Sequence, residues 1–162
     1  MEEKKEDSIQ LSDAVWAVPE VGLKEFKSCS LLVEALEKEG FFIERQTDGI
    51  ETAFTATWGE GKPVIGLLAE YDALPGLSQQ AGVAEKIPLA EGTPGHFWQV
   101  TSQVGSSITH KALICAAKTM ALATIMCFDR PEVVEQAKKE LNGYTGDRYC
   151  CPVEMGRKPV NF

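Results

Sequence analysis

The sequence is poor in the residues and motifs on which many functional sites depend. It has two histidines, and its 16 lysines and arginines are outnumbered by 24 acidic residues, which gives a formal net charge of -8 at pH 7. Because no basic cluster offsets this charge, we expect neither nucleic acid nor an anionic membrane as a partner. The sequence also lacks the phosphate-loop motif G-x-x-x-x-G-K-[ST], the dinucleotide motif G-x-G-x-x-G and the serine-hydrolase motif G-x-S-x-G.

No targeting segment is recognisable at the start of the sequence. The stretch from Met1 to Asp7 is dominated by charged residues and has neither an apolar core nor a small-residue cleavage site, so we expect a cytoplasmic protein. The one long apolar run, Ala112 to Phe128, has Lys118 near its middle. A lysine at the centre of a bilayer costs about 2.5 to 3.5 kcal/mol, so the run predicts a buried helix rather than a membrane span.

The cysteines are five in number, an odd count for a disulfide framework. Three of them, Cys29, Cys115 and Cys127, fall on periodic apolar segments, where cysteine packs as a small apolar residue. Cys150 and Cys151 are adjacent and lack the C-x-x-C spacing of zinc or redox sites. We therefore expect free thiols.

Four stretches show the periodicity of helices. Ser8 to Ala17 predicts a short helix, and Leu23 to Glu39 a longer one with apolar residues every three to four positions. Ser106 to Phe128 predicts a long helix that is apolar on nearly all sides. Pro131 to Leu141 predicts an amphipathic helix with proline in its first turn.

Three short segments rich in aromatic and β-branched residues predict strands: Phe41 to Gln46, Thr52 to Trp58 and Val64 to Glu70. The third is almost continuously apolar, as in a central strand covered on both faces. The predicted fold class is therefore α/β, a partial three-layer sheet with flanking helices. We expect residues 1–162 to form a single domain, in which the long helix is buried across the sheet.

Candidate functional residues are few. Glu70 and Asp72 follow the predicted central strand, at the edge of the sheet where open α/β folds usually bind ligands. They suit a general base or a metal site, although the following Ala-Leu-Pro-Gly is equally typical of a solvated turn. His96, on a loop or at a strand start, and His110, in the first turns of a helix, are each more often structural than catalytic when isolated.

Several segments resemble the zinc-dependent aminoacylase and carboxypeptidase-like amidohydrolases, in particular the aminobenzoyl-glutamate utilization branch of these metallopeptidase-like enzymes. The matching segments of the first half are Val21–Phe26, Thr52–Ala56 and Gly61–Gln80. Those of the second half are Gly92–Gln99, Ser107–Lys111 and Tyr149–Pro152. Residues 1–90 resemble the N-terminal part of the family and residues 91–162 its C-terminal part, so the central part of the family sequence is missing between them.

The resemblance implies metal-dependent hydrolysis of amide bonds in N-acyl amino acids or p-aminobenzoyl-glutamate-like substrates. It assigns His96 as a zinc ligand and Glu70 and Asp72 as catalytic residues beside the metal. In the family, the remaining ligands, the general base and a lid domain that also dimerises lie in the missing part. The resemblance therefore indicates a truncated catalytic-type domain that is incomplete as an enzyme.

Two hypotheses follow from this incompleteness. The chain is a remnant of an amidohydrolase that keeps part of a zinc site, or it is a non-catalytic α/β module that acts by self-association or by pairing with a full-length relative. Missing strands would leave sheet edges and apolar helix faces uncovered, so we expect a homo-oligomer, most simply a homodimer.

Overall fold

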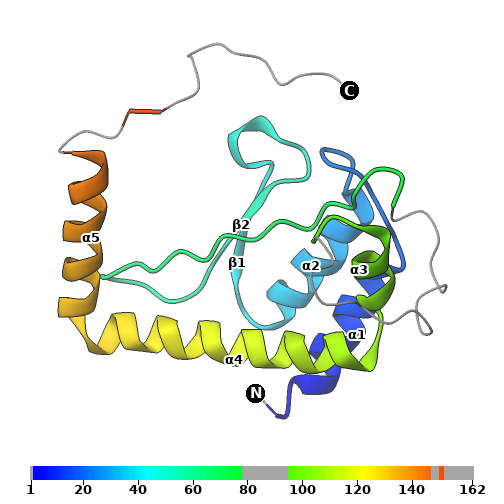
Figure 1. Ribbon diagram of the computed structural model, residues 1–162, viewed down its shortest axis with the longest axis horizontal. Helices are drawn as coiled ribbons and strands as arrows, with labels where there is room; N and C mark the ends of the chain where they lie inside the picture. Colours follow the sequence, from blue (N-terminus) through cyan, green and yellow to red (C-terminus); the bar gives the residue numbers. More distant parts are fainter. Residues whose placement is uncertain (1, 78–94, 147–149, 152–162) are drawn as a thin grey trace. The chain divides into compact units, whose positions relative to one another are not determined.

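The computed structural model describes residues 2–77, 95–146 and 150–151. Within them lie helices and one small sheet, drawn in Figure 1. In chain order the elements are α1 (Lys5–Trp16), α2 (Phe26–Lys38), β1 (Phe42–Arg45), a short 3-10 helix (Thr47–Gly49), β2 (Phe54–Thr57), α3 (Trp98–Gln103), α4 (Ser107–Asp129) and α5 (Pro131–Thr145). The chain divides into two compact units, Met1–Met120 and Ala121–Phe162, with the boundary inside α4.

The four predicted helices are confirmed as α1, α2, α4 and α5. Helix α2 buries Ser28, Cys29 and Val33, which share one face because they lie at helical spacing. Helix α5 runs four residues past its predicted end at Leu141 and stops at Gly146, whose φ of 69° suits glycine. All five cysteines are free thiols, as expected.

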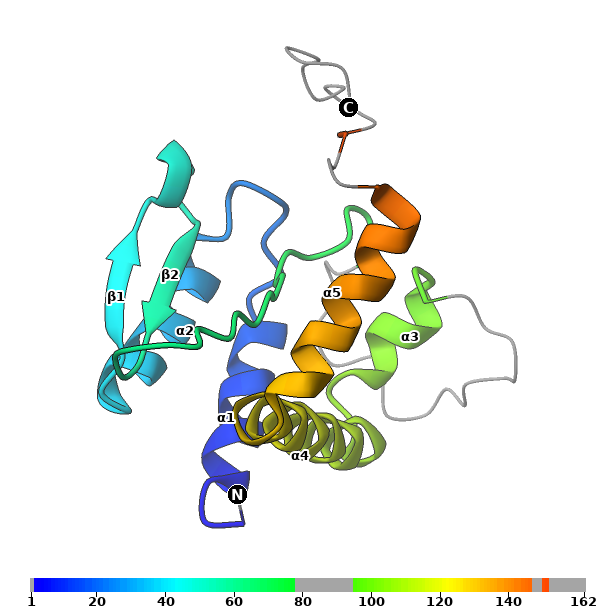
Figure 2. The same ribbon diagram turned by 90° about the vertical axis from the view of Figure 1, so that its left-hand side faces the viewer.

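Strands β1 and β2 form an antiparallel hairpin, which confirms the first two predicted strands. Phe42 lies opposite Thr57, and Arg45 lies opposite Phe54. Figure 2 shows the two strands side by side, and α2 makes contacts with both. The 3-10 turn between them places Asp48 in the left-handed region at φ 54°, where Asp is better tolerated than most residues.

The third predicted strand, Val64 to Glu70, does not form. In the described part of the chain the sheet has two strands, so the prediction of a central strand in a partial three-layer sheet was wrong. Val64, Leu67 and Leu68 are 81%, 65% and 98% exposed. A doubly covered strand needs a neighbour on each edge and a layer on each face, and the described residues supply neither. The coarser α/β character remains, as helices with a small sheet.

The prediction that the long helix is buried was also wrong. Of the residues of α4, Ile114 is buried, whereas apolar residues such as Ile108 (70%) and Leu122 (67%) are largely exposed. The composition of the helix is that of a buried element, but burial needs surrounding apolar surface that the described residues do not provide. By length and composition α4 could also cross a membrane, which is weak evidence by itself.

Candidate functional site

One cavity in the first unit brings the predicted site residues together. It has a volume of about 1090 Å³, and its lining includes residues of α1, the segment from Glu70 to Leu77, α3 and the first half of α4. Glu70, Asp72 and His96 all contribute to its wall. The sequence therefore selected three residues that share a cavity, although they lie far apart along the chain.

The three side chains do not form a metal site by themselves. Glu70, Asp72 and His96 belong to exposed residues. Among the residues that the structure describes, no three His, Cys, Asp or Glu side chains are grouped so that they could hold a metal ion. A structural or catalytic zinc ion needs at least three protein ligands, so the described residues do not fit a complete zinc site.

Tyr71 anchors the segment that carries the two carboxylates. Its hydroxyl donates a hydrogen bond to the carbonyl of Thr52, and its ring lies 6.2 Å from that of Phe54 in β2. Two residues further on, the Ala73 N–H donates to the carbonyl of Glu20 at 2.7 Å. These contacts fix the backbone on either side of Asp72, although no strand pairing holds it.

A polar cluster around the buried Glu25 holds Thr52, the residue to which Tyr71 binds. Glu25 is 8% exposed. Its carboxylate accepts hydrogen bonds from the Thr52 hydroxyl at 2.7 Å and from the Leu23 N–H at 2.9 Å. Leu23 has a φ of 66°, a region that costs energy for a leucine, and the bond to Glu25 holds it there. The cluster thus fixes the loop before α2 and the residue to which Tyr71 binds.

Burial raises the pKa of the Tyr71 hydroxyl well above its ordinary value of 10.0. Two further effects raise this pKa: the interaction of the hydroxyl with the Cys29 thiol, and the negative charges of the nearby Glu25 and Glu20 carboxylates. Tyr71 is therefore a neutral phenol at physiological pH, which is the form that can donate to a carbonyl.

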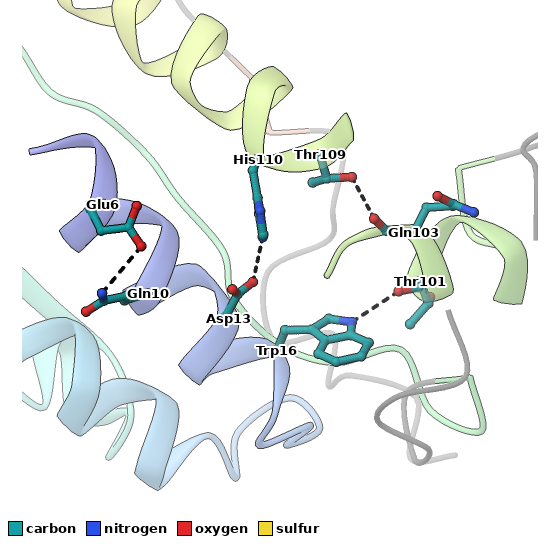
Figure 3. A network of polar contacts seen from close by, with 8 residues as sticks. All are labelled: Glu6, Gln10, Asp13, Trp16, Thr101, Gln103, Thr109 and His110. Atoms are coloured by element: carbon teal, nitrogen blue, oxygen red, sulfur yellow. Dashed lines mark hydrogen bonds and ion pairs between the residues drawn. The ribbon is translucent and has the colours of Figure 1, made fainter. Parts of the chain in front are cut away.

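Polar contacts join α1 to α3 and α4 in the same unit, as Figure 3 shows. The Trp16 indole N–H donates to the carbonyl of Thr101 at 3.1 Å, and His110 Nε2 lies 2.8 Å from Asp13 Oδ1. A Cβ added at Gly105 would lie 3.3 Å from the Trp16 ring, so glycine allows the close approach there. His110 thus links α4 to α1, a contact that agrees with the expectation of a structural histidine.

Sequence reasoning missed α3 and the anchoring role of Tyr71. The segment after His96 was expected to be a loop or strand start, whereas Trp98–Gln103 is helical. Its β-branched and aromatic residues carry no helical signal. For Tyr71 a signal existed: it lies between two acidic residues, and in an extended segment its side chain lies on the opposite face from theirs.

Comparison with known proteins supports the family resemblance that the motifs indicate. One of the subunits of p-aminobenzoyl-glutamate hydrolase from Escherichia coli (strain K12) is 45% identical over 152 residues, which cover 94% of this chain. The chain belongs to that family. It spans 28% of the relative's own length, so most of the relative has no counterpart here. No family model matches the chain.

Proposed function

We propose that the chain is a partial amide-hydrolase module, which binds an amide substrate in the cavity of its first unit and needs a second polypeptide to complete a catalytic site. The observation that carries this proposal is the cavity itself. Glu70, Asp72 and His96 line it together, while the described residues offer no complete set of metal ligands. The family relationship supplies the reaction class.

The lining of the cavity favours an amide with an aromatic acyl group. Trp16, Trp98, Leu11 and Leu74 contribute apolar surface to the same cavity as the carboxylates. Aromatic rings gain most from burial against such side chains, and a few polar groups then fix the orientation. The substrate class is therefore N-acyl amino acids, with p-aminobenzoyl-glutamate as the first compound to test.

The residues of the chain would have separate roles. Asp72 or Glu70 would take a proton from the attacking water, because a carboxylate at a cavity wall can serve as a general base. His96 is the one ligand that this chain would offer to zinc, with the remaining ligands from the second polypeptide. Tyr71 would hold the two carboxylates in place through its bond to Thr52.

The test compares the chain alone, a full-length relative alone and the two together. Tryptophan fluorescence should report binding of p-aminobenzoyl-glutamate to the chain alone. We expect no hydrolysis by the chain alone and increased hydrolysis in the mixture, an increase that His96→Ala removes. Elemental analysis of tag-free protein should find less than one zinc per chain.

Two results would contradict the proposal. Turnover by the chain alone with stoichiometric zinc would show that no second polypeptide is needed. Absence of both substrate binding and any effect on the relative would instead support the non-catalytic alternative, a module that acts through association alone. The exposed apolar residues of Val64 to Ala69 and of α4 favour that second candidate.

A further inference from the structure

The segment from Val64 to Ala69 has the sequence of a buried strand and the environment of an exposed loop. Val64 and Leu68 are 81% and 98% exposed. Within the described residues, none of the backbone groups from Val64 to Glu70 takes part in a hydrogen bond, and Figure 1 draws the segment as a plain coil. An apolar, unpaired segment of this kind is a template for pairing with another strand.

The sequence of the segment is complementary to itself when it runs antiparallel. If Gly66 lies opposite Gly66 of a second copy, then Val64 lies opposite Leu68, and Lys62 lies opposite Glu70. The two ends thus pair opposite charges, while the middle pairs apolar side chains. Neither Lys62 nor Glu70 forms an ion pair in the described part of the chain, so both charges are available.

We propose that two copies of this chain associate through an antiparallel pair of Lys62–Glu70 segments, with a two-fold axis at Gly66. A two-fold contact of this type uses the same surface on both copies and closes at two, so it yields a dimer rather than a filament. The proposal does not depend on amide hydrolysis, because it rests on the exposed segment and its charges.

Pro63 and Gly66 fix the details of this pairing. Pro63 has no N–H, so its pair with Ala69 is non-hydrogen-bonded. Pairs alternate along an antiparallel ladder, so Gly66 opposite Gly66 is a hydrogen-bonded pair with about 5.5 Å between the Cα atoms. A Cβ added at Gly66 meets nothing within 4 Å in the chain, so the position has room for a side chain.

The register can be tested by cross-linking. Gly66→Cys should form a 66–66 disulfide on mild oxidation, because the expected Cα separation lies within the range that disulfides span. Leu68→Cys is the matched control. In this register position 68 lies opposite Val64 of the second copy, so the two introduced cysteines would be four residues apart along the strand and should not form a disulfide. Peptide mass spectrometry identifies the linked positions and separates them from the natural cysteines.

Charge reversal tests the same register without covalent chemistry. In sedimentation velocity, Lys62→Glu and Glu70→Lys should each weaken dimerisation about tenfold or more, because two symmetry-related pairs become repulsive. The double variant should restore it. Circular dichroism checks that each variant folds, as we expect for substitutions at exposed positions.

Each outcome decides for or against this pairing. A 66–66 disulfide with rescue in the double variant supports the proposal. Four results would each overturn it: a monomer at all concentrations, a dimer whose affinity neither single charge reversal changes, a 68–68 disulfide, or polydisperse aggregation. Pairing with a full-length relative but not with itself would also overturn it, whereas failure to hydrolyse an amide would leave this result untouched.

Discussion

Glu20 connects the start of α2 to the segment that carries the candidate site. Its carboxylate accepts hydrogen bonds from the N–H groups of Lys27 and Ser28 and from the Ser28 hydroxyl, so it caps the helix. Its backbone carbonyl accepts from Ala73. Burial acts to raise the pKa of Glu20, but the bonds from Ser28 and Lys27 outweigh it and hold the pKa below the ordinary 4.5.

This cap predicts a pH-dependent loss of stability. Since the folded pKa lies below the unfolded value, the stabilisation is complete above pH 4.5 and disappears as pH falls through the folded value. Glu20→Gln should lower the free energy of unfolding by about 1 kcal/mol at pH 7, with a smaller difference at pH 3. Urea unfolding at both pH values measures it. Glu51→Gln, at an exposed residue, is the control, and an equal loss at both pH values would contradict the assignment.

At the scale of elements, α4 shows that composition and burial are separate properties. Its first part belongs to the first unit, where His110 pairs with Asp13 of α1 and Ile114 is 8% exposed. Ile108, in the first turns of the same helix, is 70% exposed. Contact with the rest of the unit therefore depends on a narrow stripe of α4 rather than on its whole apolar surface.

Because only this stripe of α4 is buried, replacement of isoleucine by alanine should affect stability unequally at positions 114 and 108. Ile114→Ala should destabilise the chain by about 2 kcal/mol or more, because it removes a buried side chain. Ile108→Ala should change stability by less than about 0.5 kcal/mol. Chemical denaturation compares the two variants directly. Equal costs at both positions would show that Ile108 is covered in solution.

At the scale of the whole molecule, a net charge of -8 coexists with several exposed apolar stretches. The acidic surface opposes non-specific aggregation, while the apolar stretches favour specific association. When folded chains associate and unfolded chains do not, association stabilises the folded state by mass action. The stability of this chain is therefore expected to depend on its concentration.

Calorimetry can test this dependence. Over roughly a hundredfold increase in protein concentration, the thermal midpoint should rise by about 5 °C if the chain dimerises. Leu68→Lys, which places a charge in the proposed apolar pairing, should abolish the rise while leaving the midpoint of the dilute protein unchanged. A midpoint independent of concentration for the unmodified chain would argue for a monomer.

The local sequence determined the hairpin and, apart from α3, the α-helices of the described residues. The periodicity of Leu23 to Glu39 predicts α2, and the alternation of Thr52 to Trp58 predicts β2, because both signals arise within a few neighbouring residues. The motifs from Gly61 to Gln80 indicated the family that the 45% identical relative confirms. They also directed attention to Glu70, Asp72 and His96, which share a cavity.

Only the tertiary structure decided which apolar residues are covered and how the site segment is held. Val64 to Glu70 and α4 have the composition of buried elements, but burial depends on surfaces distant in sequence that the described residues do not supply. The anchor of Tyr71 on Thr52 likewise joins residues from separate segments. The alternation of Glu70, Tyr71 and Asp72 indicates that the tyrosine faces away from the carboxylates, but no local pattern identifies Thr52 as its partner.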